Sequence, residues 1–359
     1  MKTLTTMSEK RAVWPAVKPD ISVIIPMYNA AETIRDCLES ILSSQGVRYE
    51  VIVVNDASTD HSLAIALEFP CTVISLASNI MAANCRNLGA RHAQSDILMF
   101  FDADQLMQAD TLHCFVNVLH ANPEMDAVVG SFAAHTPRSG FFSKFKNLRH
   151  HHVHQTANPE GRTLASGLMA IRKSTFDLYG GFEPAYQAAS IEDIALGYKL
   201  RRNNHRILFR GDIQVVHLKS YTFIDLLVSD IFHRAIPWIE VMIRDRIWNN
   251  NLNTKIGNIA CVVVSWLMPP LVVISGIQSS GIVVAACIIL IWTLNRGLLR
   301  AAFTSCGFVF LIQSLLFIPF MYCYQGLGAM AGLACYAFGH SIIGKRPVAE
   351  TRYEIFQGG

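Results

Sequence analysis

The stretch Asp96-Ile-Leu-Met-Phe-Phe-Asp-Ala-Asp104 is the part of the sequence that decides the fold. Its run of consecutive apolar residues predicts a short strand buried on both faces of a sheet. The carboxylates of Asp102 and Asp104 follow directly, and side chains two residues apart at a strand end point to the same side. Ligands of parallel α/β sheets bind beyond the carboxyl ends of the strands. This stretch therefore predicts both the sheet and the position of its site.

Strand and helix patterns alternate along the first half of the chain. Short β-branched runs predict strands at 21–25, 50–54, 71–76 and 96–101. Helical spacing of apolar residues predicts helices at 32–43, 62–68, 84–94 and 110–121. Further strands are predicted at 126–132, 166–171 and 212–218, with a helix at 192–203. This order predicts an α/β fold with a mostly parallel sheet that helices cover on both faces.

Composition divides the chain into a soluble part and a membrane part. Of the 359 residues, 52% are apolar and only 16% are charged, against about 25% charged in ordinary soluble domains. These values exclude a disordered chain and a wholly soluble one. The net charge of +3 comes without the clustered basic face that nucleic-acid binding needs, so no nucleic-acid partner is expected.

The region 256–344 contains no acidic residue, and its only cationic side chains are Arg296 and Arg300. Four apolar stretches predict about four membrane helices: 257–277, 281–295, 303–323 and 326–343. The tight connection at 325–326 leaves three spans open. With four spans all flanking basic residues fall on the side of the soluble part, which the positive-inside rule makes cytoplasmic. No apolar leader precedes the first strand, and nine cysteines without a CxxC pair fit a reducing compartment.

Two segments suggest contact with a membrane surface. The stretch 144–154 is basic and contains four histidines, His150, His151, His152 and His154. We interpret it as a solvated basic loop near lipid phosphates rather than as a metal-binding cluster. The stretch 222–248 combines apolar residues at helical spacing with arginines, which is typical of amphipathic helices in a membrane interface. A pair of core helices is the alternative.

Carboxylates at strand ends carry the first indication of chemistry. Asp56 follows the strand at 50–54, and Asp102 and Asp104 follow the strand at 96–101. Two oxygen ligands at one sheet edge suit Mg²⁺ or Mn²⁺ held jointly with phosphate groups. The alternative is a loop that caps the following helix.

Five motifs occur in order over residues 20–220: Ile24-Ile-Pro-Met-Tyr-Asn29, Val54-Asn-Asp-Ala-Ser-Thr-Asp60, Arg86-Asn-Leu-Gly89, Phe101-Asp-Ala-Asp104 and Ile191-Glu-Asp193. Together they resemble the inverting glycosyltransferases of family 2, whose nucleotide-diphosphosugar-binding domain has the GT-A fold. The membrane region is similar in plan to glycolipid and polyprenyl-phosphate glycosyltransferases. A Gln-rich QxxRW signature, typical of polysaccharide synthases, is missing from the sequence, and 234–238 only resembles it distantly.

The resemblance implies a role for each matching residue. It assigns nucleotide binding to Pro26, Tyr28, Asn29, Asp56, Arg86 and Asp102. It assigns metal binding to Asp102, Asp104 and His217. Asp193 is the implied catalytic base, with Glu192 and Gly167 on the acceptor side. His217 is equally compatible with a satisfied core histidine, and Glu192 with a carboxylate favoured at a helix N-terminus.

These observations predict a multi-pass enzyme of the cell membrane with a cytoplasmic catalytic domain. It would transfer a sugar from a nucleotide-diphosphate sugar, a UDP-sugar by preference, to a lipid or polyprenyl-linked acceptor. The alternatives are a processive polysaccharide synthase and a non-catalytic membrane assembly protein with the same fold. The predicted segments are a tail (1–20), the GT-A domain (21–220), interface helices (221–254), the transmembrane region (255–344) and a cytoplasmic tail (345–359).

Overall fold

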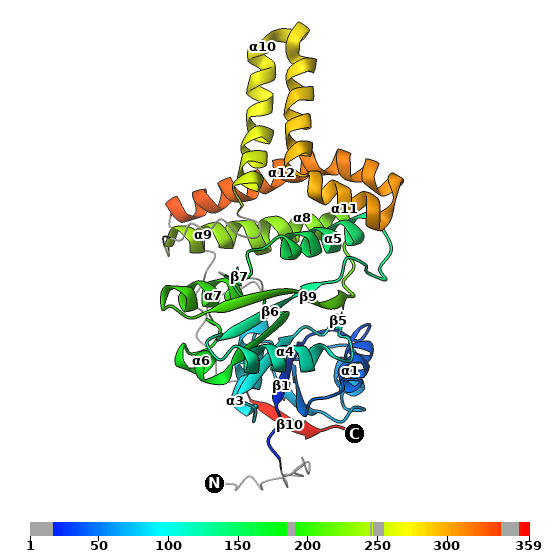
Figure 1. The fold of residues 1–359 in the computed structure, drawn as a ribbon, viewed down its shortest axis with the longest axis vertical. Helices are drawn as coiled ribbons and strands as arrows, with labels where there is room; N and C mark the ends of the chain where they lie inside the picture. The colour runs from blue at the N-terminus through cyan, green and yellow to red at the C-terminus, as the bar shows by residue number, and fades with distance from the viewer. Residues whose placement is uncertain (1–16, 162, 185–190, 245, 247–254, 339–351) are drawn as a thin grey trace.

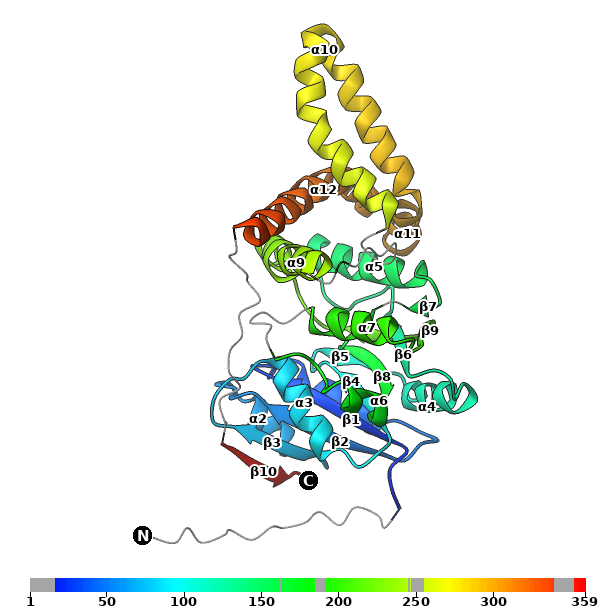
Figure 2. The ribbon, with the colours of Figure 1, turned by 90° about the vertical axis from the view of Figure 1, so that its left-hand side faces the viewer.

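The computed structural model describes residues 17–161, 163–184, 191–244, 246, 255–338 and 352–359, without the side chains of 275–279. An α/β domain and a helical part are stacked along the long axis of the molecule (Figure 1). A view from the side shows the same two parts and a long helical hairpin that projects away from the sheet (Figure 2). Most of the predicted N-terminal tail, the end of the interface segment and residues 345–351 of the predicted C-terminal tail lie outside the described residues.

The strands of the α/β domain are β1 (Ile21–Met27), β2 (Tyr49–Asn55), β3 (Thr72–Leu76), β4 (Ile97–Phe101), β5 (Gln105–Leu106), β6 (Ala127–Phe132), β7 (Glu160–Gly161), β8 (Leu168–Arg172), β9 (Ile207–His217) and β10 (Tyr353–Gln357). In the described residues they form one sheet with the order β10-β3-β2-β1-β4-β8-β6-β9-β5, and β7 pairs with β9. The block β3-β2-β1-β4 is parallel, whereas β8 runs antiparallel to both β4 and β6. The parallel block contains the four strands that the sequence predicts first.

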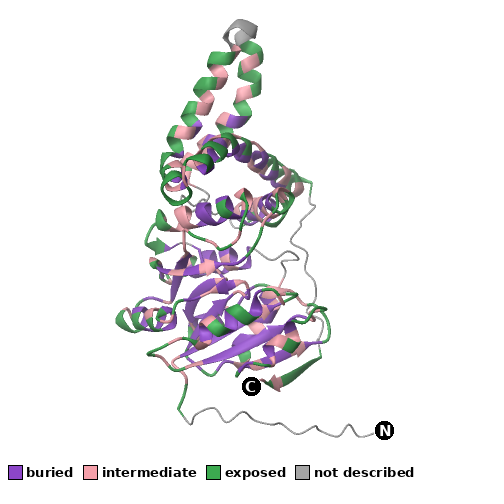
Figure 3. Cartoon of the chain, turned by 90° about the vertical axis from the view of Figure 1, so that its right-hand side faces the viewer, coloured by how far each residue is buried: buried purple, intermediate pink, exposed green. Residues whose placement is uncertain are grey.

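Helices cover both faces of this sheet, as the alternation of patterns predicts. One face carries α1 (Ile34–Leu42), α2 (Ser62–Ala66) and α4 (Thr111–Ala121). The other carries α3 (Ala82–His92), α6 (Lys173–Leu178) and α7 (Glu192–Arg202). The strands of the parallel block are buried almost throughout, and burial is concentrated in this domain (Figure 3). The predicted α/β fold is therefore confirmed.

The helical part consists of α5 (Phe141–Gln155), α8 (Phe223–Asp230), the π-helix η1 (Ile231–Ala235), α9 (Ile236–Arg244), α10 (Ile256–Leu294), α11 (Arg296–Cys306) and α12 (Phe308–Ala337). The row α8–η1–α9 and α5 lie between the sheet and α12 (Figure 1). A third apolar cluster joins α5, α8, α10, α11 and α12. The segment 222–244 is therefore helical as predicted, and α12 covers it.

Among the described residues, two segments are long and apolar enough to cross a membrane: Ile256–Ile274 and Phe308–Ala337. A third is possible if Ser280–Leu294 and Arg296–Cys306, which meet at 71°, form one span. The described residues thus contain two or three candidate spans, which agrees with the alternative of three spans, and the prediction of about four stays a prediction. The expected break at 325–326 does not occur, because α12 continues through it. Glycine does not end a helix whose backbone is protected by close packing in an apolar environment.

The stretch 144–154 is not the solvated loop that its basic residues suggested. It forms most of α5, and Lys146 and His150 are buried. Lys146 forms an ion pair with Asp230, whose other carboxylate oxygen accepts a hydrogen bond of 2.9 Å from Tyr324 Oη. Burial, with Arg234 and Lys146 nearby, lowers the pKa of His150 well below its usual value, so this histidine is neutral at neutral pH. The segment is therefore a buried link between the sheet and α12.

The last described strand returns to the α/β domain. β10 pairs antiparallel with β3 at the edge of the sheet, from Tyr353 opposite Leu76 to Gln357 opposite Thr72. The two ends of the helical region are thus tied to the same domain. Figures 1 and 2 show α10 as two antiparallel arms that leave and return to the level of α12.

Candidate active site

Four carboxylates from distant parts of the sequence line one cavity of about 270 Å³ between the sheet and the helical part. Asp102 and Asp104 follow β4, and Glu192 and Asp193 begin α7. β4 ends at the carboxyl edge of the parallel block. The carboxylates of Asp102 and Asp104, which follow β4, therefore face the first turn of α7. We name this space the polar cavity. The structure brings together the carboxylates that the sequence placed in two separate motifs.

Arg86 ties the two motifs together. Its Nη1 donates to Glu192 Oε1 and its Nη2 donates to Asp102 Oδ1, both over 2.7 Å. Burial opposes its charge, but the two carboxylates outweigh that effect and raise the pKa of Arg86. Charge-assisted bonds of this kind are strong and directional. Arg86 therefore fixes the acidic side chains at the floor of the polar cavity, and it lines that cavity itself.

Asp104 lies beside His217, which ends β9. Asp104 Oδ1 and His217 Nε2 are 3.5 Å apart, and both residues line the polar cavity. Burial disfavours the Asp104 carboxylate, but His217 and Lys219 outweigh it and hold the pKa of Asp104 below its usual value. Neighbouring ligands of one small divalent cation are separated by a similar distance, since each lies about 2.1 Å from the ion. Asp104 and His217 thus fit a metal ion that phosphate oxygens also bind. The described part of the chain contains no group of three or more His, Cys, Asp or Glu side chains that could hold a metal ion by themselves.

Asp193 has the properties of a base. Its Oδ2 accepts a hydrogen bond of 2.8 Å from the Ser166 amide, and its Oδ1 accepts one of 2.7 Å from the Ile194 amide. Burial and the adjacent charge of Glu192 raise the pKa of Asp193 to about 7, against the lowering effect of the hydrogen bonds and Arg86. A carboxyl group with this pKa can accept a proton at neutral pH and release it afterwards.

Gly167 occupies a position next to Asp102 that has no room for a side chain. A Cβ added there would collide with Asp102 Oδ2 and lie 2.8 Å from Gln105 Nε2. Even alanine would therefore displace the carboxylate that Arg86 holds. The structure places Gly167 in the wall of the polar cavity, beside the predicted metal ligands.

The residues predicted to bind the nucleotide base lie at the ends of β1 and β2, outside the lining of the polar cavity. Asp56 accepts hydrogen bonds from the amides of Ile80 (2.6 Å) and Met81 (3.0 Å), and burial raises its pKa despite these bonds. The Cys85 side chain also forms a hydrogen bond with this carboxylate, and Asp56 is only 3% exposed. Tyr28 is 53% exposed at the end of β1.

Pro26 lies near the end of β1, and Asn29 lies in the bend that follows this strand. Pro26 lies in β1 opposite Val54 of β2. Asn29 adopts a left-handed backbone with φ of 49°. Its Oδ1 accepts a 2.8 Å hydrogen bond from the Thr59 amide, which joins the first two predicted motifs. The two motifs thus form one surface next to the exposed ring of Tyr28.

Sequence reasoning missed a group of side chains that close the polar cavity from the helical part: His150, His154, Lys219, His233, Arg234 and Trp238. Burial lowers the pKa of His154 to about 4. His150 and His154 are therefore neutral side chains in the wall of the polar cavity. A signal was present, because the histidines at 150 and 154 are one helical turn apart and face one side.

The fold and the site define a nucleotide-diphosphosugar-type α/β domain whose strand-end carboxylates face a cavity. Residues 22–180 match the family model "Glycosyl transferase family 2". The part of the chain that carries the strand-end carboxylates is therefore similar to the domain of family 2 glycosyltransferases. Its GT-A fold is shared with a mannosyltransferase, PcManGT, of Pyrobaculum calidifontis, solved in complex with GDP-Man and Mn²⁺. That structure superposes with a TM-score of 0.57 at 18% identity, over 92% of this chain and 91% of the other.

Two curated relatives are more similar in sequence. A poly-β-1,6-N-acetyl-D-glucosamine synthase of Staphylococcus epidermidis is 23% identical over 251 residues, which cover 66% of this chain and 58% of that protein. An uncharacterized glycosyltransferase of Haemophilus influenzae is 28% identical over 186 residues, which cover 50% of this chain and 61% of that protein. The chain thus spans about three fifths of the length of these relatives.

Proposed function

We propose that the chain is a membrane-bound inverting glycosyltransferase. It takes a nucleotide-diphosphate sugar, a UDP-sugar by preference, and transfers the sugar to a lipid or lipid-linked acceptor at the cytoplasmic face. The observation that carries this proposal is the polar cavity. It combines the strand-end pair Asp102 and Asp104 with the raised-pKa carboxyl of Asp193, directly beneath a layer of apolar helices.

The chemistry follows from these side chains. The acceptor hydroxyl attacks the sugar carbon from the face opposite the nucleotide, the bond to the diphosphate oxygen breaks, and the nucleoside diphosphate leaves with the electron pair. Asp193 accepts the hydroxyl proton as the new bond forms. Glu192, held by Arg86, keeps the first turn of α7 in place and orients the acceptor beside Gly167.

The donor is held at the sheet edge. Tyr28 lies against the base, and Pro26, Asn29 and Asp56 shape the surface that receives it. Asp104, His217 and Asp102 would hold Mg²⁺ or Mn²⁺ there. Such an ion neutralises charge that develops on the leaving diphosphate. Since Arg86 bonds to Asp102, it also fixes the carboxylate nearest the diphosphate.

The membrane arrangement rests on the return of β10 to the sheet. Residues 353–357 pair with β3 of the catalytic domain, so an even number of crossings between β9 and β10 would fit this arrangement. The two arms of α10 would supply them, with α12 lying along the membrane surface and α8–η1–α9 bringing the acceptor to Asp193. We retain the division into a catalytic domain at 21–220, an interface segment at 221–254 and a membrane region at 255–344.

A processive polysaccharide synthase is the second candidate, favoured by the identity to a poly-β-1,6-N-acetyl-D-glucosamine synthase. The two candidates differ in their products. A lipid-directed enzyme gives one organic-phase product with one added sugar, and a synthase gives an aqueous polymer whose length grows with time.

The test is a donor screen with the purified full chain in nanodiscs, with and without Mn²⁺, and with membrane lipid extract as the acceptor source. Release of nucleoside diphosphate from one donor, together with a lipid product one sugar heavier, supports the proposal. A polymer product would replace it with the second candidate. Absence of turnover with every donor, together with no Mn²⁺-dependent rise in Tm on adding nucleoside diphosphates, would indicate the non-catalytic alternative.

A further inference from the structure

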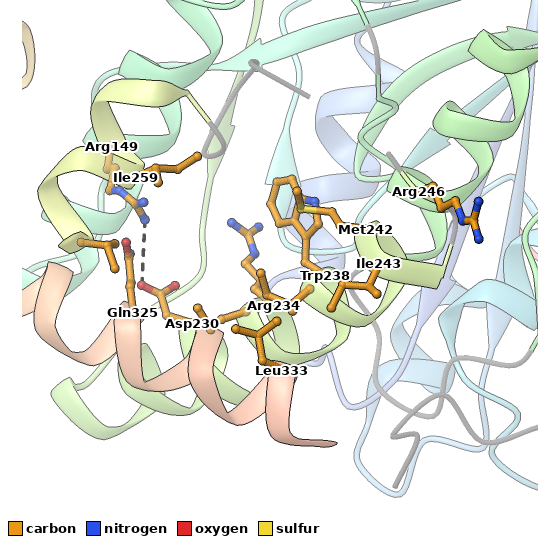
Figure 4. A pocket seen from close by; sticks show the side chains of 14 residues that line it. Arg149, Asp230, Arg234, Trp238, Met242, Ile243, Arg246, Ile259, Gln325 and Leu333 are labelled. Carbon is orange, nitrogen blue, oxygen red and sulfur yellow. Dashed lines mark ion pairs between the residues drawn. The ribbon is translucent and has the colours of Figure 1, made fainter. Parts of the chain in front are cut away.

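A second cavity, of about 590 Å³, lies between α5, η1, α9, α10 and α12. Its walls are mostly apolar, with Trp238, Met242 and Ile243 on one side and Leu333 of α12 on another (Figure 4). We name this space the apolar pocket. Its volume is within the range of about 300–1,000 Å³ that small-molecule sites usually have.

Close helix contacts keep this pocket open. On α12, a Cβ at Gly328 would lie 2.7 Å from the Ala235 Cβ, and one at Gly332 would lie 3.0 Å from the Ile236 backbone oxygen. The two backbones therefore already meet along this line, and α12 cannot move closer to fill the space. Small residues at such positions are typical of tight helix pairs in membranes. The apolar pocket is a built feature of the helical part.

Positive charge is in excess in this otherwise apolar lining. Arg149, Arg234 and Arg246 line the pocket, and Asp230 is the one acidic residue among its described lining residues. Asp230 is already engaged by Lys146 and lies 3.9 Å from Arg149 (Figure 4). The pocket therefore suits a molecule that is apolar over most of its length and carries negative charge.

The two cavities meet at Arg234 and Trp238, which line both. Trp238 Nε1 donates to Tyr198 Oη over 3.2 Å, and an apolar cluster joins α9 to α7, the helix that begins with the predicted base. Arg234 Nη1 lies 2.9 Å from His150 Nε2. Because burial keeps His150 neutral, that nitrogen accepts the bond and Arg234 keeps its charge. The charged guanidinium of Arg234 thus lies at the junction of the two cavities. The acyl chain of a bound lipid would end there, and the catalytic space would begin.

We infer that the apolar pocket binds the chain of an anionic lipid acceptor, with its phosphate beside Arg234 and its reacting end in the polar cavity. The inference rests on the proposed function, because it assigns the acceptor of that reaction to lipids that carry a phosphate at the end of the apolar chain and a hydroxyl at the reacting end. An apolar pocket alone would suit a neutral lipid equally well. The arginine at the junction of the two cavities selects the phosphate-bearing one.

The experiment measures binding without turnover. Farnesyl phosphate is titrated into the full chain in detergent, and retained ligand is counted by native mass spectrometry. Farnesol tests the need for the phosphate, and inorganic phosphate tests the need for the chain. We expect wild type to bind farnesyl phosphate at least about tenfold more tightly than farnesol, as a charge-assisted hydrogen bond would give. Inorganic phosphate should not compete at millimolar concentration.

Two variants locate the site. Ala329→Phe places a ring in the apolar pocket and should weaken farnesyl phosphate binding at least tenfold, whereas Ala334→Phe, exposed on the same helix and outside the lining, should not. Arg234→Gln should reduce the preference over farnesol to about onefold. Equal binding of farnesol and farnesyl phosphate by wild type, or unchanged binding by Ala329→Phe, would overturn the inference. Since no donor is present, a failure of the glycosyltransferase proposal leaves this result unaffected and is recognised separately in the donor screen.

Discussion

The polar cavity and the apolar pocket share two lining residues but have opposite chemistry. The polar cavity is built from strand ends and a helix N-terminus, and its carboxylates are held by Arg86. The apolar pocket is built from helix faces alone. The difference teaches that the carboxylates are held at strand ends and at the start of α7, whereas the proposed acceptor site is formed by helix packing. Substitutions in the first should therefore change kcat, and substitutions in the second should change the KM for the acceptor or the stability.

The largest effect is expected from Asp104→Ala. This change removes the carboxylate that faces His217, and the diphosphate then loses charge compensation worth several kcal/mol. Turnover should fall by about a thousandfold or more. Nucleoside diphosphate release is the measurement, with Asp96→Ala as the control because Asp96 is an exposed partner of Lys18. Full activity of wild type in EDTA would contradict a role for a divalent cation.

Asp193→Asn should give the next largest effect. The amide keeps the shape of the carboxylate but cannot accept a proton, so kcat should fall by at least about a hundredfold. Donor affinity should stay nearly constant, because the nucleotide contacts are made by other side chains. Asp177→Asn, in the exposed part of α6, is the matched control. Near wild-type turnover with a purified hydroxyl acceptor would move the base to Glu192.

The size of the loss in kcat caused by Asp193→Asn also depends on the chemical type of the acceptor. A hydroxyl must lose its proton and should show the full loss. An ionised phosphate oxygen that attacks directly needs no base, so it should show a smaller loss. Comparing a glycolipid with a prenyl phosphate in the Asp193→Asn variant therefore separates the two acceptor types.

The polar cavity could be predicted from sequence more fully than the apolar pocket. Asp102 and Asp104 follow a buried strand, and the carboxyl ends of parallel strands all lie at one edge of the sheet, where ligands bind. The proximity of Glu192 and Asp193 to that edge came from a family resemblance. The bond from Arg86 to both groups came only from the structure, because a contact between residues 106 positions apart leaves no local pattern.

The apolar pocket could not be predicted for a related reason. Hydropathy identifies α10 and α12 as apolar but does not say which stands upright and which lies flat. The orientation of each helix depends on which of its faces pack against other helices, as Gly328 of α12 packs against Ala235. Likewise, the basic residues of 144–154 predict a surface loop, whereas Lys146 of α5 is buried because Asp230 from a distant segment compensates its charge.

The kcat/KM for a hydroxyl acceptor should depend on pH, with a tenfold change per pH unit on the acidic side. The raised pKa of Asp193, about 7, means that the base is protonated and inactive below that pH. We expect kcat/KM for a hydroxyl acceptor to fall tenfold per pH unit below about 7. The groups facing Asp193 are Glu192, which raises its pKa, and Arg86, which lowers it. A pH profile of wild type against Asp193→Asn is the measurement, and the same acidic limb in both would contradict the assignment.

The same shift has a consequence for stability. An unfolded aspartate has a pKa near 3.8, so folding favours the protonated form of Asp193. Its contribution to stability is present below pH 4 and is lost as the pH rises to about 7. Asp193→Asn avoids that loss. Its NH2 group loses the hydrogen bond from the Ser166 or the Ile194 amide, so the expected result is a Tm that changes less than that of wild type between pH 4 and pH 8.

The smallest effect on catalysis is expected behind the apolar pocket. Tyr324 of α12 is buried, and its hydroxyl donates to Asp230, the acid that Lys146 of α5 also contacts. Tyr324→Phe keeps the ring and removes only this bond. A hydrogen bond to a charged group contributes roughly 1.5–3 kcal/mol, so the apparent Tm in detergent should fall by roughly 3–10 °C. Because Tyr324 lines neither cavity, kcat should stay unchanged.

Tyr336→Phe is the matched control, since Tyr336 lies on the same helix and is 46% exposed. It should leave both Tm and kcat as in wild type. If Tyr324→Phe lowered kcat as strongly as a polar-cavity variant, the division of labour between the two cavities would fail, because a helix contact would then control the chemical step. If it left Tm unchanged, α12 would be held on the catalytic domain by apolar contacts alone, and the buried Lys146–Asp230 pair would add no attachment through this helix.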